Sequence, residues 1–262
     1  RKNRKGTKTI NGDFLTLKPE DVEVQYGIHD VLVIIGGPPC QGFSVAGKRI
    51  IDDDRNKLYK PFVRFVEHFQ PKAFVMENVP NILSIGGGAV KDAILTDFSV
   101  LGYNVTYKVL TASDYGTPQN RRRAIFVGMR DGMDFVFPER SVKDLVTTSQ
   151  ALSDLPEESV EDGSEYPIMP QSEYQKQIRK NATRLYNHQI TVHTAETQRI
   201  IAMVPDGGNY KCLLKEMWSL RKVHIGGKGS LLRQVGNAMY SFMVRTLQRK
   251  GHIENTVTIL AA

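Results

Sequence analysis

The sequence predicts an α/β fold with a mostly parallel sheet. Two short, largely apolar runs, at 31–35 and 73–77, are followed by glycine and asparagine, and the first is rich in β-branched residues, as buried parallel strands are. Between them, and again after the second run, apolar residues recur at helical spacing. Strands that alternate with helices in this way are typical of a sheet with helices packed on its faces.

The first predicted strand, 31–35, is bounded by Asp30 and Gly36. A helix is expected to follow and to stop before Pro71, because proline cannot continue a helix. Its apolar face is formed by Leu58, Phe62, Phe65, Val66 and Phe69.

The second predicted strand, 73–77, is followed by a helix over 89–101 that ends at Gly102. Further strands are predicted at 103–110 and 124–128. After residue 137 the pattern fades: the acid-rich stretch 153–166 is typical of a loop, and helices are predicted over 195–204 and 239–248. The expected organisation is a catalytic domain over 1–145, a small domain over 146–232 and a C-terminal segment, 233–262, that returns to the first domain.

The 262 residues carry a net charge of +7, which favours polyanionic partners such as nucleic acid but fits a solvated basic tail equally well. No run approaches the roughly 18 apolar residues that cross a bilayer. The first residues lack the apolar centre of a signal peptide, so a cytoplasmic or nucleoid-associated location is expected. Cys40 and Cys212 are too few for a disulfide framework or a four-ligand zinc site.

The stretch "GGPPCQGFS" follows the first predicted strand. Gly36 and Gly37 permit a sharp turn, and Pro38 and Pro39 stiffen the backbone before Cys40. A stiff loop at the carboxyl end of a parallel strand suits a nucleophilic thiol. A buried structural cysteine in a turn fits the same residues.

Charged side chains stand at two other predicted strand ends. Glu77 closes the second strand, where it is either a proton donor beside the cysteine or an exposed carboxylate. In "TPQNRRRAIFVG", strand alternation predicts that Arg121 and Arg123 point to one side and Arg122 to the other. Two guanidinium groups on one side could hold a carbonyl, carboxylate or phosphate, or could form a solvated charge run.

Four motifs, "GGPPCQGFS", "MENVPN", "ASDYGTPQNRRRAIFVG" and "RQVGNA", occur in the order found in DNA cytosine-5 methyltransferases. The chain therefore resembles this family, of the bacterial restriction-modification type, over about 10–130 and 184–245. The resemblance implies a Rossmann-like S-adenosylmethionine-dependent methyltransferase sheet with a small, reduced second domain.

The resemblance also implies a mechanism. Cys40 would add to C6 of a cytosine flipped out of duplex DNA, and Glu77 would bond the base's N3 edge and amino group. Arg123 would contact the base O2 and Arg121 would brace the pocket. S-adenosylmethionine is the implied methyl donor, and no metal is implied.

Further residues match family positions. Asp13 in "NGDF" would bond the adenine amino group, and Phe14 would lie against the purine. Other implied cofactor contacts are Pro39, Leu58 and Asn237. Implied DNA contacts are Gln41, Ser44, Arg49 and Gln119, with 41–55 as a loop that closes over DNA. The spacing of His188 and His193 favours a helix-start or core role over a metal site.

The chain departs from the family in two places. The family's Gly-rich cofactor turn lies upstream of "NGD", where this sequence has only ten residues, and the region that reads the DNA sequence is short. The strand at 31–35 is then expected to have an unpaired edge. A complementary chain supplying the cofactor-binding segment, or a longer sequence, would complete the sheet.

The sequence thus predicts a DNA cytosine-5 methyltransferase that acts on duplex DNA without a membrane partner. Two alternatives stay open: a tRNA cytosine-5 methyltransferase, and a methyltransferase-derived DNA-binding or regulatory subunit without activity of its own.

Overall fold

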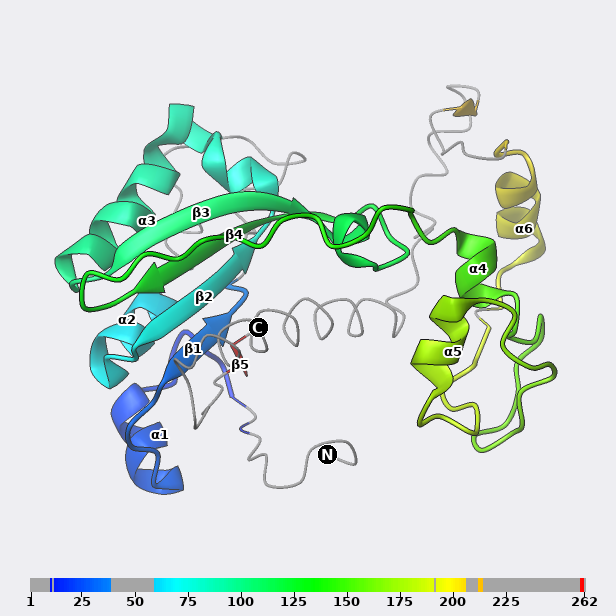
Figure 1. Ribbon diagram of the computed structural model, residues 1–262, viewed down its shortest axis with the longest axis horizontal. Helices are drawn as coiled ribbons and strands as arrows, with labels where there is room; N and C mark the ends of the chain where they lie inside the picture. Colours follow the sequence, from blue (N-terminus) through cyan, green and yellow to red (C-terminus); the bar gives the residue numbers. More distant parts are fainter. Residues whose placement is uncertain are drawn as a thin grey trace. The chain divides into compact units, whose positions relative to one another are not determined.

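The computed structural model describes residues 10, 12–38, 59–190, 192–205, 212–213 and 260–261. The chain divides into two compact units, Arg1–Asp144 with Ser241–Ala262, and Leu145–Tyr240 (Figure 1). The catalytic role expected of the first unit and the target-recognition role expected of the second stay predictions. No helix in these described ranges is long and apolar enough to span a membrane.

The first unit is built on a sheet with the strand order β3-β4-β2-β1-β5. Its strands are β1 (Val33–Gly36), β2 (Ala73–Asn78), β3 (Asn104–Thr111), β4 (Arg122–Met129) and β5 (Leu260–Ala261). The four strands predicted from the sequence are confirmed to within a few residues. The sequence analysis predicted no strand at β5.

One strand of the sheet runs against the others. β1 pairs in parallel with β2 and β5, but β4 runs antiparallel to both β2 and β3. The other four strands run in one direction, so the predicted, mostly parallel sheet is confirmed with β4 as its exception. A parallel crossover needs about a dozen residues or more. The connection between β3 and β4 holds only the single-turn 3-10 helix η5 (Ala112–Tyr115), so the chain turns back on itself.

The prediction that β1 has an unpaired edge was wrong at two positions. Ile35 and Gly36 pair with Leu260 and Ala261 of β5, so these two residues of β1 have a paired strand on each side. The residues that provide this pairing lie far from β1 in the sequence, so the local pattern around β1 could not predict it.

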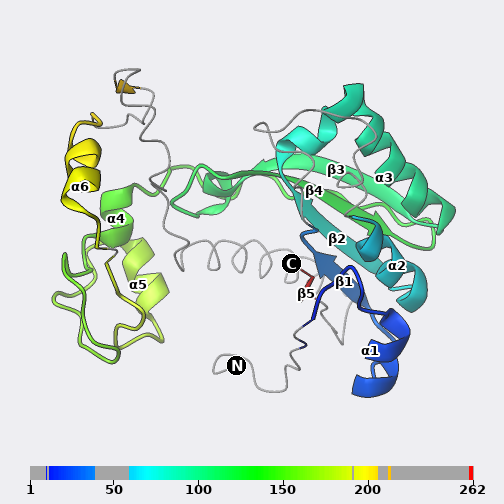
Figure 2. The same ribbon diagram turned by 180° about the vertical axis from the view of Figure 1, so that it is seen from behind.

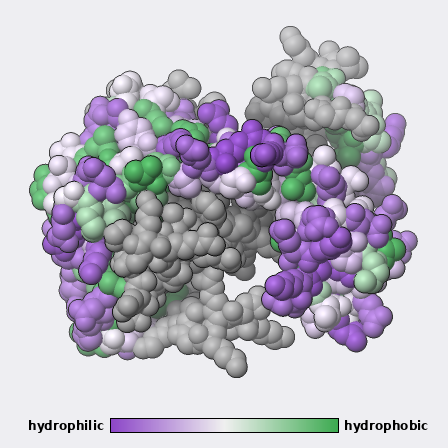
Figure 3. Space-filling model, viewed as in Figure 1, coloured by the Kyte–Doolittle hydropathy of each residue, from purple (hydrophilic) through white to green (hydrophobic). Residues whose placement is uncertain are grey.

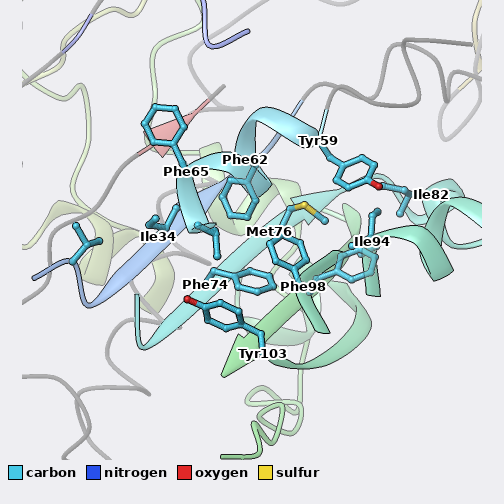
Figure 4. Close-up of a cluster of buried hydrophobic side chains, with 14 of the residues drawn as sticks. Ile34, Tyr59, Phe62, Phe65, Phe74, Met76, Ile82, Ile94, Phe98 and Tyr103 are labelled. Atoms are coloured by element: carbon cyan, nitrogen blue, oxygen red, sulfur yellow. The ribbon is translucent and has the colours of Figure 1, made fainter. Parts of the chain in front are cut away.

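Helices α2 (Lys60–Phe69) and α3 (Ala89–Val100) pack on the sheet through one buried cluster (Figures 1 and 2). In Figure 4, aromatic rings from strand β2 and from both helices meet. The ring of Phe74 stacks on Phe98 at 4.0 Å, and Phe62 meets both edge-on. Each such ring, fully buried, contributes about 1.5–3 kcal/mol. The fully buried aromatic residues of this cluster are Phe62, Phe65, Phe74, Phe98 and Phe126.

The helix ends follow from local chemistry. α2 ends at Gln70, which adopts the left-handed conformation (φ 44°) directly before Pro71, as predicted. α3 ends before Gly102, which has φ 84°. Two 3-10 turns, η3 (Pro80–Leu83) and η4 (Ile85–Gly88), connect β2 to α3.

Helix α1 (Pro19–Tyr26) was not predicted, because it lacks a continuous apolar stripe and buries only Pro19 and Val22. Charged side chains join it to α2. His68 on α2 lies 2.7 Å from the Glu23 carboxylate and 3.5 Å from that of Glu20, and His29 lies 3.3 Å from Glu23. The hydrogen bond from His68 is the main cause that lowers the pKa of Glu23 below its usual 4.5; burial opposes this.

The contribution of Glu23 to stability is expected to depend on pH. Because its pKa is lowered in the folded state, this contribution is present above pH 4.5 and is lost as pH falls through the lowered value. Urea unfolding of the wild type and Glu23→Gln should show a stability difference near pH 5.5, where ordinary carboxylates are ionised, and this difference should shrink in more acidic buffer. Glu67→Gln, an exposed position on α2, is the control. A difference that grows on acidification would contradict this.

The second unit contains α4 (Thr148–Leu152), α5 (Glu173–Arg179) and α6 (Ala195–Ala202). A buried Asp154 accepts from Arg179 at 3.1 Å, and the Arg179 guanidinium lies 3.7 Å from the Tyr166 ring centroid. The helix predicted over 195–204 is confirmed, as is the absence of a helix or strand over 153–166. α4 and α5 were not predicted.

The two histidines singled out in the sequence lie in this unit. His188 bonds the carbonyl of Pro156 at 2.9 Å, and His193 directly precedes Thr194, the N-cap of α6. Across the described part of the chain, no group of three or more His, Cys, Asp or Glu side chains is arranged to hold a metal ion.

In Figure 3, hydrophilic residues are interspersed with smaller hydrophobic patches, an ordinary pattern for a water-exposed surface.

Candidate active site

Two strand ends carry the predicted site, and an asparagine joins them. β1 and β2 are parallel and in register at Gly36 and Met76, so the turn after β1 lies beside the end of β2. The buried Asn78 donates from Nδ2 to the carbonyl of Pro38 at 3.3 Å, and its Oδ1 accepts from the Val79 N–H at 2.9 Å. The backbone that leads into Pro39 and Cys40 is therefore held against β2.

Gly37 allows the Glu77 carboxylate to approach this turn. A Cβ added at Gly37 would lie 3.3 Å from Glu77 Oε2, a close contact that the glycine avoids. Glu77 is thus positioned next to the segment that precedes the predicted nucleophile.

Glu77 is also paired across the sheet. In the antiparallel register of β2 and β4, Glu77 lies opposite Ile125, and Arg123, two residues away, projects from the same face. Arg123 Nε lies 2.5 Å from Glu77 Oε1. The arginine side chain is 17% exposed and the carboxylate 40%, so one partner is largely enclosed while the other stays accessible. Arg123 Nη1 donates to its neighbour's carbonyl at 2.8 Å.

Arg121 shares this electrostatic environment. Arg122 is exposed, whereas Arg121 and Arg123 are half-buried, as strand alternation predicts. Burial lowers the pKa of Arg121, the positive charge of Arg123 lowers it further, and the Glu77 carboxylate raises it. Two guanidinium groups and one carboxylate therefore lie close together, with a net positive charge that suits an electron-rich group.

The connection between β3 and β4 is braced before it reaches these arginines. The Ala112 N–H donates to the carbonyl of Arg121 at 2.9 Å, and the Tyr115 hydroxyl donates to that of Pro138 at 3.0 Å. Gly116 turns the chain with φ 83°. The Oε1 atom of Gln119 is buried and has no hydrogen-bond partner among the described residues, so it is available to accept from a ligand.

Asp13 forms a tight turn rather than a contact with the arginine cluster. Its Oδ1 accepts from the Leu15 N–H at 2.9 Å, and its carbonyl accepts from the Thr16 and Leu17 N–H groups. The Phe14 ring packs against Phe65 of α2, with centroids 4.8 Å apart. The Asp13 side chain therefore stabilises a turn, and its exposed carboxylate keeps the cofactor role open as a prediction.

Several predicted residues lie outside the described part of the chain. They are Pro39, Cys40, Gln41, Ser44, Arg49, Leu58 and Asn237, together with the loop 41–55 and the helix 239–248. Asn78 was expected only to end a strand, and its hydrogen bond to the carbonyl of Pro38 was not predicted. The signal was a polar amide directly after Glu77, at a strand end that must be buried.

A profile of the family described as C-5 cytosine-specific DNA methylase matches residues 1–258. This chain belongs to that family. Among curated relatives, it is 40% identical over 226 residues to Type II methyltransferase M.DdeI of Desulfomicrobium norvegicum, covering 82% of this chain and 54% of the relative. It is 37% identical over 203 residues to Type II methyltransferase M.AgeI of Thalassovita gelatinovora, covering 66% and 47%.

A solved structure supports the same assignment. A DNA modification methyltransferase encoded within a prophage of E. coli aligns with a TM-score of 0.56 and 26% identity, over 74% of this chain and 61% of that chain. The predicted fold class, a Rossmann-like methyltransferase sheet, is confirmed. This C-5 cytosine-specific DNA methylase chain spans about half the length of the curated relatives it matches, so the activity of the whole protein is a proposal.

Proposed function

We propose that this protein transfers a methyl group from S-adenosylmethionine to C5 of a cytosine flipped out of duplex DNA, through a covalent bond to Cys40. The observation that carries the proposal is the Glu77–Arg123 ion pair beside the turn that leads to Cys40. Membership of the cytosine methylase family supplies the reaction class.

The chemistry explains why these residue types are needed. Cytosine C5 is a weak nucleophile until C6 is attacked. The Cys40 thiolate forms a bond to C6, and the displaced electron pair makes C5 electron-rich. Glu77 bonds the N3 edge and the amino group, and Arg123 bonds O2, so both stabilise the charge that develops on the ring. After methyl transfer, a water molecule acting as base takes the C5 proton, the electron pair of that C–H bond restores the C5–C6 double bond, and the thiolate leaves C6.

The described geometry favours a pocket that is organised before the base arrives. Glu77 is held by Arg123 on one oxygen, and the missing side chain at Gly37 leaves room for the other oxygen beside the turn. Preorganised groups of this kind lower the barrier more than groups that must reorient, because they spend no reorganisation energy during the reaction. The accessible carboxylate leaves room for a base edge to bond.

The target carbon of a paired base cannot be reached inside a duplex, so the cytosine must leave the stack. Arg121 lies close to Arg123 and Glu77, and we assign Gln119, two residues earlier in the chain, to DNA contact. Gln41, Ser44 and Arg49, in the loop 41–55, complete the proposed DNA contacts.

S-adenosylmethionine fits the chemistry of the turn at 13–17. The exposed carboxylate of Asp13 is a suitable acceptor for the adenine amino group, and Phe14 offers an apolar ring for the purine. Pro39, Leu58 and Asn237 would hold the rest of the molecule. Bound there, S-adenosylmethionine supplies an activated methyl group on a sulfonium.

The test uses duplex DNA that carries 5-fluorocytosine at methylation sites, together with S-adenosylmethionine. Fluorine at C5 prevents the elimination step, so the wild-type protein is expected to form a covalent adduct that survives denaturing electrophoresis, and Cys40→Ser none. tRNA carrying the same base is the control. Adduct with tRNA alone would replace the proposal with a tRNA methyltransferase. DNA binding without any adduct would replace it with a binding or regulatory subunit.

A further inference from the structure

The turn at 13–17 is held by a single arginine on helix α2. Nη2 of Arg64 lies 2.8 Å from the carbonyl oxygen of Leu17, 3.3 Å from that of Leu15 and 3.4 Å from that of Phe14. One guanidinium nitrogen carries two hydrogens, so at most two of these carbonyls have a full bond at one time. The short contact to Leu17 is the principal one, and the other two share the remaining hydrogen.

The charge of Arg64 has no carboxylate partner among the described residues. Its Nε is buried and lacks a hydrogen-bond partner in the same set. Its described hydrogen bonds all go to the carbonyls of this turn. A partly buried cation that relies on carbonyl dipoles is stable only while those carbonyls converge. The guanidinium therefore favours the one backbone conformation in which they do.

The adjacent residue on α2 holds the side chain of the same turn. Phe65 is fully buried and contacts the ring of Phe14, while Arg64 binds the backbone. Leu15 in turn donates its N–H to Asp13 Oδ1. Backbone and ring are thus fixed from α2, and the Asp13 carboxylate remains exposed in a set orientation.

We propose that Arg64 is a positioning residue for S-adenosylmethionine, acting through Asp13 and Phe14 without touching the ligand. This inference rests on the proposed function, because it assigns the turn at 13–17 to the adenine end of that molecule. Lysine is a poor substitute at this position, because its ammonium is a point charge that cannot reproduce the planar fork.

The matched control is Arg130, which also donates to a carbonyl next to α2. Its Nη1 lies 2.8 Å from the carbonyl oxygen of Gln70, the residue directly after the last residue of α2. Arg130→Met removes a comparable bond without touching the turn at 13–17. Any general loosening of α2 should then affect both variants.

The experiment compares the wild type, Arg64→Met, Arg64→Lys and Arg130→Met. Hydrogen exchange without ligand follows the backbone amides of Leu15, Thr16 and Leu17, which bond to Asp13 in the folded turn. Titration with S-adenosylmethionine gives its Kd, a duplex DNA titration gives that of DNA, and steady-state kinetics separate KM from kcat. Thermal unfolding identifies any variant that fails to fold. If Arg64→Met does not fold, the exchange rates and the Kd of Arg64→Lys test the proposal instead.

In both Arg64 variants we expect the three amides to exchange faster than in Arg130→Met. The Kd of S-adenosylmethionine should rise about tenfold in Arg64→Met, which corresponds to about 1.4 kcal/mol, with DNA affinity and kcat at saturating S-adenosylmethionine nearly unchanged. If Arg130→Met changed amide exchange and Kd as much as the Arg64 variants do, the positioning role of Arg64 would be overturned. Unchanged exchange and Kd in both Arg64 variants would overturn it too, and either result would leave the proposed function standing. A wild-type protein that binds DNA but no S-adenosylmethionine would overturn this inference and the proposed function together.

Discussion

Replacement of Glu77 by Gln is expected to lower kcat for DNA methylation by about 10²- to 10⁴-fold, the range in which positioned acid–base groups contribute. The carboxylate stands 2.5 Å from Arg123 and faces the turn that leads to Cys40. Glutamine keeps the shape, but it lacks the charge that Arg123 binds and cannot exchange a proton with N3 of the ring. The substitution thus acts on the chemical step.

Single-turnover methylation of duplex DNA measures this effect without interference from product release. Glu139→Gln, at an exposed position with no described ion pair, is the matched control and should behave as the wild type. Cofactor affinity should be unchanged in both, because the turn at 13–17 is not altered. A rate for Glu77→Gln within about threefold of the wild-type rate would remove Glu77 from the mechanism.

Gly128→Ala is expected to have the largest effect on stability. Gly128 lies directly opposite Phe74 in the pairing of β4 with β2, and the Phe74 ring covers it. An added Cβ would lie 2.5 Å from Phe74 Cζ and 2.6 Å from Cδ1, and closer still to Cε1. The ring cannot move away freely, because it stacks on Phe98 at 4.0 Å and meets Tyr103 edge-on at 5.3 Å.

Overpacking of this kind destabilises a core by about 1–3 kcal/mol, and more where the neighbours cannot shift. Chemical denaturation should therefore show a lower midpoint for Gly128→Ala with an unchanged slope. Gly12→Ala is the control, since a Cβ there meets nothing within 4 Å. If Gly128→Ala were as stable as Gly12→Ala, the close packing of Phe74 on β4 would be incorrect.

Local patterns in the sequence predicted most elements of the first unit. β2, α2 and α3 end within a residue or two of their predicted bounds, because their apolar spacing and their stop signals are both short-range. The opposite orientation of Arg122 and its two neighbours follows from strand geometry alone. Helices α1, α4 and α5 were missed because each lacks an apolar stripe long enough to stand out.

The sequence by itself determined the family, through four ordered motifs, and the residue types that a cytosine C5 methyl transfer needs. Only the tertiary structure decided that β4 runs against its neighbours, that Asn78 holds the carbonyl of Pro38, and that Arg64 holds the turn at 13–17. The reason is physical: periodicity and turn chemistry act between residues close in the chain. The Asn78 and Arg64 contacts, and the pairing of β4 with β2, join groups about forty or more residues apart, whose meeting depends on how the whole sheet is assembled.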